Sequence, residues 1–133
     1  MKRFFLLTLA SAALLGASAA PVKTYEVKSP DGRLALVLTA GERLSFTVAR
    51  DGETLVAPSE MALTLSTGEV LGESPRVRSA RRRAVTETID APLYRQSRFD
   101  AAYNELDLRL RGDYGILARA YDDGVCYRFY TER

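Results

Sequence analysis

The chain has 133 residues with 19 basic and 17 acidic side chains, a formal net charge of +2, one cysteine and no histidine. A single cysteine excludes an intramolecular disulfide, so the chain must fold through a hydrophobic core, and without histidine a nucleophilic Cys126 would lack an imidazole base. The balanced charge provides no long-range field toward nucleic acid or an anionic membrane, so we expect neither as a partner.

The first residues have the pattern of an export signal. Lys2 and Arg3 precede the uncharged, mostly apolar stretch Phe4–Leu15, and Ala17-Ser18-Ala19 has the small-x-small pattern that signal peptidase reads. We expect a signal peptide helix over residues 1–19, cleaved after Ala19, and a periplasmic or secreted mature chain. The alternative is an uncleaved anchor, but about 12 apolar residues are short against the roughly 20 that span a bilayer. Cleavage removes Lys2 and Arg3, which leaves 17 basic and 17 acidic side chains and no stable membrane span.

From residue 24 onward, apolar residues alternate with polar ones in short runs that turn residues separate. The alternation predicts strands over residues 25–28, 34–38, 44–48, 54–57 and 61–65. Ser29-Pro30-Asp31-Gly32 and Asp51-Gly52 are typical turn sequences, because glycine accepts positive φ without steric cost. Pro58 is expected to end the fourth strand, since proline cannot donate to a sheet ladder.

The middle of the chain alternates less regularly. Residues 66–75 predict a loop, residues 77–89 an exposed or edge strand, and residues 91–101 give no clean period. Within the edge strand, Arg81-Arg82-Arg83 has acidic neighbours, so we expect a solvated segment rather than a phosphate site. A long strand follows, with Leu106, Leu108 and Leu110 on one face.

The last third predicts an antiparallel hairpin. Asp122-Asp123-Gly124 is a turn, and it lies between the apolar run 116–121 and the strand 125–130. Val125, Tyr127 and Phe129 share one face of that strand, and we expect Cys126 to be a small buried hydrophobe within it. Many short strands without a helical pattern favour an all-β fold, an antiparallel β-sandwich.

Two motifs in this region resemble a known family. They are Tyr103-Asn104-Glu105-Leu106 and the run Arg119–Tyr130, which begins Arg-Ala-Tyr-Asp-Asp-Gly-Val. Together they are similar to the N-terminal domain of glycoside hydrolase family 97, secreted bacterial enzymes that act on α-linked glucosides and galactosides. The likeness covers Val22–Arg133.

The resemblance implies an architecture beyond this chain. In the family the N-terminal domain is a super-sandwich that packs against a catalytic (β/α)₈ barrel, and calcium is expected in the intact enzyme. No barrel pattern is present here, so residues 20–133 are expected to be the N-terminal part of that domain, an incomplete sandwich. Unpaired strand edges would then make the isolated chain aggregation-prone or marginally folded.

The candidate site residues are carboxylates and tyrosines. Glycoside hydrolysis needs two carboxylates flanking the scissile bond, but Asp122 and Asp123 are adjacent in a turn and would point apart. We expect them to form the turn and to bond backbone amides. Glu105 is a slightly better candidate for bonding a sugar or a facing loop, but we expect a simply solvated glutamate on the exposed face of a strand. The tyrosines are candidates for sugar stacking, for core packing or for cross-strand pairs: Tyr94, Tyr103, Tyr121, Tyr127 and Tyr130.

Three classes of function follow. The favoured one is a non-catalytic N-terminal β-sandwich portion of a secreted bacterial glycoside hydrolase, whose partner is the catalytic barrel. The alternative is a free-standing exported module that binds carbohydrate. An autonomous enzyme is least expected, because the sequence has no histidine, metal-ligand cluster or phosphate loop, and no catalytic, substrate-binding or metal residue is assignable.

Overall fold

The computed structural model describes residues 21–93, 95 and 97–132, and over these residues the regular structure consists of ten β-strands. The all-β prediction is confirmed. The signal peptide predicted over residues 1–19 and the candidate Tyr94 lie outside the described residues.

The first sheet is an antiparallel meander of the strands β1 (Lys23–Lys28), β2 (Leu34–Ala40), β3 (Leu44–Arg50) and β4 (Glu53–Glu60), paired in that order. Its turns lie where the sequence predicted them. The fourth strand differs, because β4 runs through Pro58 to Glu60. β4 is an edge strand, and Pro58 lies at a register shift where it has no partner in β3, so the proline interrupts no paired position of the ladder.

The second sheet is also an antiparallel meander. It contains β7 (Val77–Asp90), β8 (Arg98–Leu110), β9 (Tyr114–Ala120) and β10 (Val125–Thr131), in the spatial order β10-β9-β8-β7. β7 is an edge strand, as expected, and the final hairpin is confirmed. β8 begins well before Leu106, because its first half pairs residue by residue with β7 from Asp90 and Arg98 onward.

The connection between the sheets is less extended than the sequence suggested. The strand predicted over 61–65 is reduced to β5 (Leu63–Thr64), which pairs with β6 (Val70–Leu71) inside the predicted loop. The backbone here is tied to β3 instead, because Leu44 donates to the carbonyl of Gly72 and accepts from the amide of Met61. A side chain at Gly72, where φ is +102°, would collide with the carbonyl of Met61.

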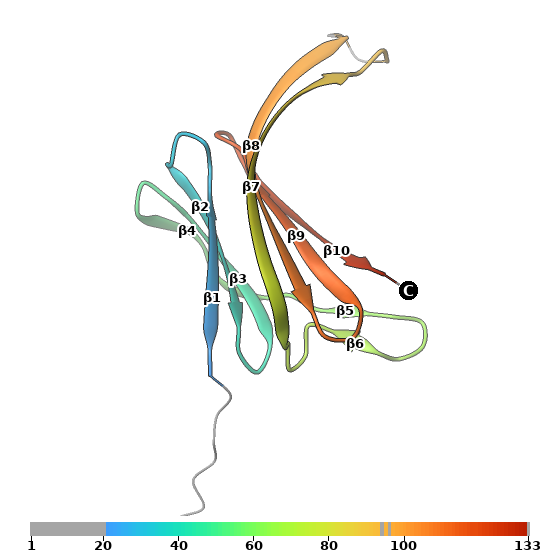
Figure 1. The fold of residues 1–133 in the computed structure, drawn as a ribbon. Helices are drawn as coiled ribbons and strands as arrows, with labels where there is room; N and C mark the ends of the chain where they lie inside the picture. The colour runs from blue at the N-terminus through green and yellow to red at the C-terminus, as the bar shows by residue number, and fades with distance from the viewer. Residues whose placement is uncertain (1–20, 94, 96, 133) are drawn as a thin grey trace, which may run out of the picture.

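The two sheets face each other and enclose one core, which confirms the sandwich (Figure 1). β2 buries every second residue along its length, the period of two that a pleated strand imposes. The second half of β8 and β9 also bury every second residue on the inner face, at 106, 108 and 110 and at 116, 118 and 120. The largest buried apolar side chains are Leu36, Leu38, Leu44, Met61, Leu71, Leu106, Leu108, Leu110 and Ile116.

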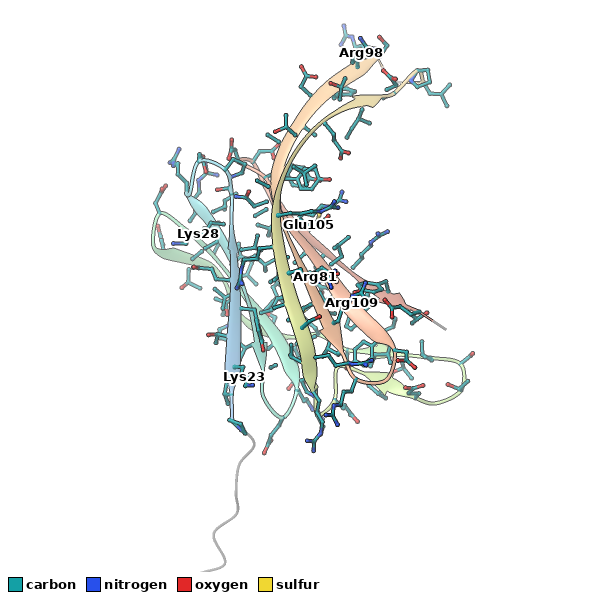
Figure 2. All side chains as sticks on the ribbon, in the orientation of Figure 1. Lys23, Lys28, Arg81, Arg98, Glu105 and Arg109 are labelled. Carbon is teal, nitrogen blue, oxygen red and sulfur yellow. The ribbon has the colours of Figure 1, made fainter. Side chains whose placement is uncertain are left out.

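Beyond the sandwich, β7 and β8 continue together as a two-stranded arm, residues 85–90 and 98–103. Figure 1 shows the arm bending away from the first sheet. Figure 2 places Arg98 at its far end and Glu105 near its base, where β8 joins the sheet.

Candidate functional site

The motif Tyr103-Asn104-Glu105 sends its side chains to opposite faces of β8. Asn104 points inward across the sandwich, where its Nδ2 donates to the carbonyl of Lys28 on β1 at 2.8 Å. Arg82 on β7 makes a similar contact, because its Nε donates to the carbonyl of Glu26 at 3.0 Å. These two side chains therefore bind the free edge of β1 and attach one sheet to the other.

Glu105 lies on the outer face of the second sheet, between two arginines. In the register of the sheet, Arg83 on β7 and Arg119 on β9 are its direct cross-strand partners. Arg83 Nε donates to Oε1 at 2.5 Å and Arg119 Nε donates to Oε2 at 2.8 Å. Glu105 is only 3% exposed, so the expectation of a solvated glutamate is wrong. The three side chains form a charge ladder across β7, β8 and β9.

The charge ladder keeps its carboxylate ionised. Burial by itself would raise the pKa of Glu105, but the hydrogen bonds and charges of Arg83 and Arg119 outweigh it and hold the pKa below its ordinary value. In turn, the hydrogen bond to Glu105 raises the pKa of Arg83. Burial would lower the pKa of Arg119, yet its hydrogen bonds to Tyr121 and Glu105 raise it. A carboxylate held in this way is a poor general acid.

Tyr103 packs beside the charge ladder at the base of the arm. Its ring lies under the Arg119 guanidinium, with Cζ 4.4 Å from the ring centroid, and beside the ring of Tyr121 at 4.9 Å. The hydroxyl donates to Oε1 of Glu87 at 2.9 Å. Burial raises the pKa of Tyr103, which is only 2% exposed. Its ring is enclosed by protein, which excludes it as a platform for stacking a sugar.

The two remaining described candidates among the tyrosines are also engaged by neighbours. Tyr130 donates to Oδ1 of Asp107 on the outer face, and burial together with that bond raises the pKa of Tyr130 to about 12. Tyr127 lies on the inner face of β10, with its ring 5.3 Å from that of Phe46. Cross-strand and core packing therefore account for the tyrosines that the structure describes.

The adjacent carboxylates Asp122 and Asp123 are exposed in the turn between β9 and β10. Asp122 Oδ1 accepts from the backbone amide of Asp31 at 2.9 Å, which joins this turn to the turn between β1 and β2. The expectation that the pair forms a turn and bonds backbone amides is confirmed for Asp122. The arrangement does not place two carboxylates across a cleft, as glycoside hydrolysis requires.

Cys126 and the arginine run lie on the surface. Cys126 is exposed on the outer face of β10, opposite Arg119, so the expectation of a buried thiol is wrong. Side chains of β10 point alternately inward and outward, and Cys126 points outward together with Arg128 and Tyr130. Arg81-Arg82-Arg83 lies on an exposed part of β7, as expected.

The main hollows of the described residues offer no pair of enclosed carboxylates. The hollow that Glu105 lines also contains Glu26, but the Glu26 side chain is 49% exposed. A hollow of about 480 Å³ at the lower end of the sandwich is lined by one acidic residue, Glu42. A second, of about 400 Å³, contains Asp113 and Glu132, but both are largely exposed and form ion pairs with Arg78 and Arg109. Among the described residues, no three His, Cys, Asp or Glu side chains gather as metal ligands. None of these residues forms a helix with the length and hydropathy needed to cross a membrane.

Comparisons with known proteins agree with this architecture. The sequence model described as "Glycosyl-hydrolase 97 N-terminal" matches residues 27–133. Over 110 residues the chain is 37% identical to a retaining alpha-galactosidase of Bacteroides thetaiotaomicron, a match that covers 83% of this chain and 17% of that protein. The chain thus spans about a sixth of the length of this curated relative.

Solved structures show the same fold. A glycoside hydrolase family 97 enzyme from Pseudoalteromonas sp. strain K8, in complex with acarbose, matches 80% of this chain and 17% of its own, with a TM-score of 0.72 and 17% identity. A beta-arabinopyranosidase matches 82% of this chain and 18% of its own, with a TM-score of 0.73 and 18% identity.

Proposed function

The chain belongs to the glycosyl-hydrolase 97 N-terminal family, and we propose that it is a non-catalytic β-sandwich portion of a secreted bacterial glycoside hydrolase. Its role is to support a (β/α)₈ catalytic barrel that acts on α-galactosides or α-glucosides. The proposal extends to calcium, which we assign to the intact enzyme and to no residue of this chain. Export is proposed from the basic, apolar and small-residue pattern of residues 1–19.

One observation carries the non-catalytic role: the carboxylate of the family motif is fully used within the sheet. Glu105 accepts one hydrogen bond on each oxygen, from Arg83 and from Arg119. A residue that bridges three strands in this way stabilises the sandwich, and at 3% exposure it presents almost no surface to solvent. The motif is therefore best explained as an internal brace of a supporting domain.

The alternative of a free-standing carbohydrate-binding module has weaker support. It predicts a row of exposed aromatic rings on one face, whereas the rings of Tyr103 and Tyr121 pack against each other at a tilt of 43°. Tyr127 is 39% exposed, but its ring lies against that of Phe46 on the inner face. The rings of these tyrosines are therefore used for packing within the protein, and they do not form the exposed row that the module would need.

The test is an activity assay on the purified chain with nitrophenyl α-galactoside and α-glucoside. The chain alone is expected to hydrolyse neither. Hydrolysis that disappears on Glu105→Gln or Asp122→Asn would contradict the non-catalytic role. Mass spectrometry of protein exported from a bacterial host tests secretion, with a mature chain beginning at Ala20 as the expected result.

A further inference from the structure

The dipeptide Asp-Gly occurs three times in the chain, each time in the turn between two consecutive strands: Asp31-Gly32, Asp51-Gly52 and Asp123-Gly124. An aspartate followed by glycine is the aspartate most prone to closing a succinimide ring, because glycine has no side chain to hinder attack by its amide nitrogen on the preceding carboxyl carbon. The dipeptide alone makes the three pairs equivalent. The structure distinguishes them, since their carboxyl and amide groups have different hydrogen-bond partners.

The first pair is restrained at both reacting groups. Ser29 Oγ and the backbone amide of Arg33 donate to Oδ1 of Asp31, and the bond from Ser29 is the chief cause that lowers the pKa of Asp31. The attacking nitrogen is engaged as well, because the amide of Gly32 donates to the carbonyl of Ser29 at 2.9 Å. Ring closure expels water from a protonated carboxyl group, so an ionised carboxylate and a bonded amide both slow it.

The second pair is restrained at its carboxyl group. Arg33 donates from Nε and Nη2 to the two oxygens of Asp51, at 3.0 Å and 2.8 Å, and these bonds lower the pKa of Asp51. The backbone amide of Asp51 also donates to the carbonyl of Arg33 at 2.8 Å. Both side chains of this ion pair are about half exposed, so we expect weaker protection here than at Asp31.

The third pair lacks these restraints. Over residues 21–93, 95 and 97–132, neither the exposed Asp123 carboxylate nor the Gly124 amide nitrogen has a hydrogen-bond or ion-pair partner. Gly124 contributes to the turn through its carbonyl, which accepts from the amide of Tyr121 at 2.7 Å. A Cβ added at Gly124 would meet no atom within 4 Å, so the surrounding protein leaves space beside the glycine.

We propose that Asp123 is a site of spontaneous modification, at which the Asp123-Gly124 linkage converts to isoaspartate faster than the other two Asp-Gly pairs do. The Gly124 nitrogen attacks Cγ of the protonated carboxyl group. The N–Cγ bond forms, the nitrogen loses its proton, and one Cγ–O bond breaks as water leaves. A second water then opens the ring: attack at Cγ restores aspartate, and attack at the main-chain carbonyl gives isoaspartate. The reaction needs no oxidant and no cofactor.

The modification would alter a turn that joins the two sheets. Isoaspartate carries the main chain through its side chain and so adds one methylene between residues 123 and 124. The bond between the Tyr121 amide and the Gly124 carbonyl spans this point. In the same turn Asp122 Oδ1 accepts from the backbone amide of Asp31, which belongs to the first sheet's turn. A longer turn would displace both bonds.

Peptide mapping of the full purified chain tests the proposal. After incubation in buffer, tryptic peptides that cover residues 29–33, 51–76 and 120–128 are examined for isoaspartate by electron-transfer mass spectrometry. Isoaspartate should form at Asp123 about threefold faster than at Asp51 and about tenfold faster than at Asp31, because a hydrogen bond lost before reaction adds to the barrier. Formation at either of the other two positions as fast as at Asp123 would overturn the proposal.

The same incubation in guanidinium chloride separates structure from sequence. Unfolding removes the hydrogen bonds of all three turns, so isoaspartate should then form at similar rates at Asp31, Asp51 and Asp123. If the native order of rates persisted in denaturant, the local sequence would determine it, and the structural basis of the proposal would be wrong.

Two variants test the reacting groups directly. Gly124→Ala places a methyl group beside the attacking nitrogen in open space, and it should slow isoaspartate formation at Asp123 about tenfold. Arg33→Gln removes the ion pair of Asp51, and it should raise isoaspartate at Asp51 toward the level at Asp123 while leaving Asp123 unchanged. An unchanged rate at Asp123 in the first variant, or at Asp51 in the second, would overturn the assignment.

Discussion

At Glu105 a single carboxylate accepts hydrogen bonds from arginines on both neighbouring strands. Removing its charge would leave two guanidinium groups facing a neutral amide on a poorly solvated part of the sheet. Arg83 and Arg119 are partly exposed, so water would compensate each in part. The position thus behaves as a structural brace whose strength depends on ionisation.

Glu105→Gln is expected to lower the free energy of unfolding by about 1.5–3 kcal/mol, the range for hydrogen bonds to charged groups. Urea denaturation of the purified chain measures this. Glu60→Gln is the matched control, because Glu60 pairs with Arg43 in an exposed position, and it should cost at most about 1 kcal/mol. An equal loss of unfolding free energy for the two variants would show that the charge ladder stabilises the fold no more than an exposed ion pair does.

The pKa of Glu105 also predicts a pH dependence. A carboxyl whose pKa is lower in the folded state contributes stability above its unfolded pKa, and the contribution is lost as pH falls through the folded pKa. For Glu105 this window lies below the ordinary value of 4.5. The pKa of Asp31 is also lowered, chiefly by a hydrogen bond from Ser29, so the unsubstituted chain loses stability in acid through more than one group.

The urea midpoints of the unsubstituted chain and of Glu105→Gln, measured from pH 7 down to pH 3, isolate the part that belongs to Glu105. The difference between the two proteins should be constant near neutral pH and should shrink below about pH 4.5. A difference that stays constant into acid would contradict an ionised Glu105.

β9 and β10 are held together by more than their backbone ladder. Gly115 is paired with Tyr130, whose ring covers the glycine and reaches Asp107 on β8. A Cβ at Gly115 would overlap that ring, so any larger residue here forces the Tyr130 side chain to move. The contact joins three adjacent strands on the outer face.

Gly115→Ala is therefore expected to displace the Tyr130 ring and to cost about 1–3 kcal/mol, as overpacking does. Chemical denaturation measures the cost, and Gly124→Ala is the control because a Cβ there meets open space. In a Tyr130→Ala background the Gly115→Ala substitution should cost much less. An undiminished cost in that background would assign the effect to the backbone instead.

The strands that the sequence predicted well are those with one face in the core. Leu34 to Leu38 and Leu106 to Leu110 alternate cleanly because the opposite sheet covers every second residue. The first half of β8 was missed because it belongs to the arm, where pairing with β7 determines the structure and no core imposes a pattern. Pro58 was misread because an edge position tolerates proline.

The candidate site shows a similar limit. Glu105 could be singled out from its motif, but its burial could not, because Arg83 and Arg119 are distant in sequence. One signal was available: counting back from the turn at Gly112-Asp113 places Glu105 opposite Arg119. Predicting the contact between Glu105 and Arg83 would have required the register of β7 against β8, and no local sequence pattern specifies that register.

In addition to the shared core, a few polar contacts at the edge of β1 join the two sheets. Arg82 and Asn104 occupy backbone carbonyls that would otherwise be available to another strand. The combined substitution Arg82→Ala with Asn104→Ala should expose this edge.

Sedimentation equilibrium is expected to give a higher average mass for the double variant than for the unsubstituted chain at the same concentration, because the double variant self-associates more. Arg81→Ala is the control. Arg81 is the cross-strand partner of Asp107 on the outer face of the second sheet, the face turned away from the first sheet. The same average mass for the control and the double variant would contradict a protective role for these two side chains.

Each sheet is made from one uninterrupted stretch of the chain, β1 to β4 and then β7 to β10, with every neighbour joined by a hairpin. Most strand pairing is therefore local, which is unusual for sandwiches, whose pairings are typically distant and slow to form. The distant contacts are those between the two meanders, such as the bond between Asp122 and Asp31 across 91 residues. A chain emerging from a ribosome or a translocation channel could thus form its first sheet before the second has been delivered.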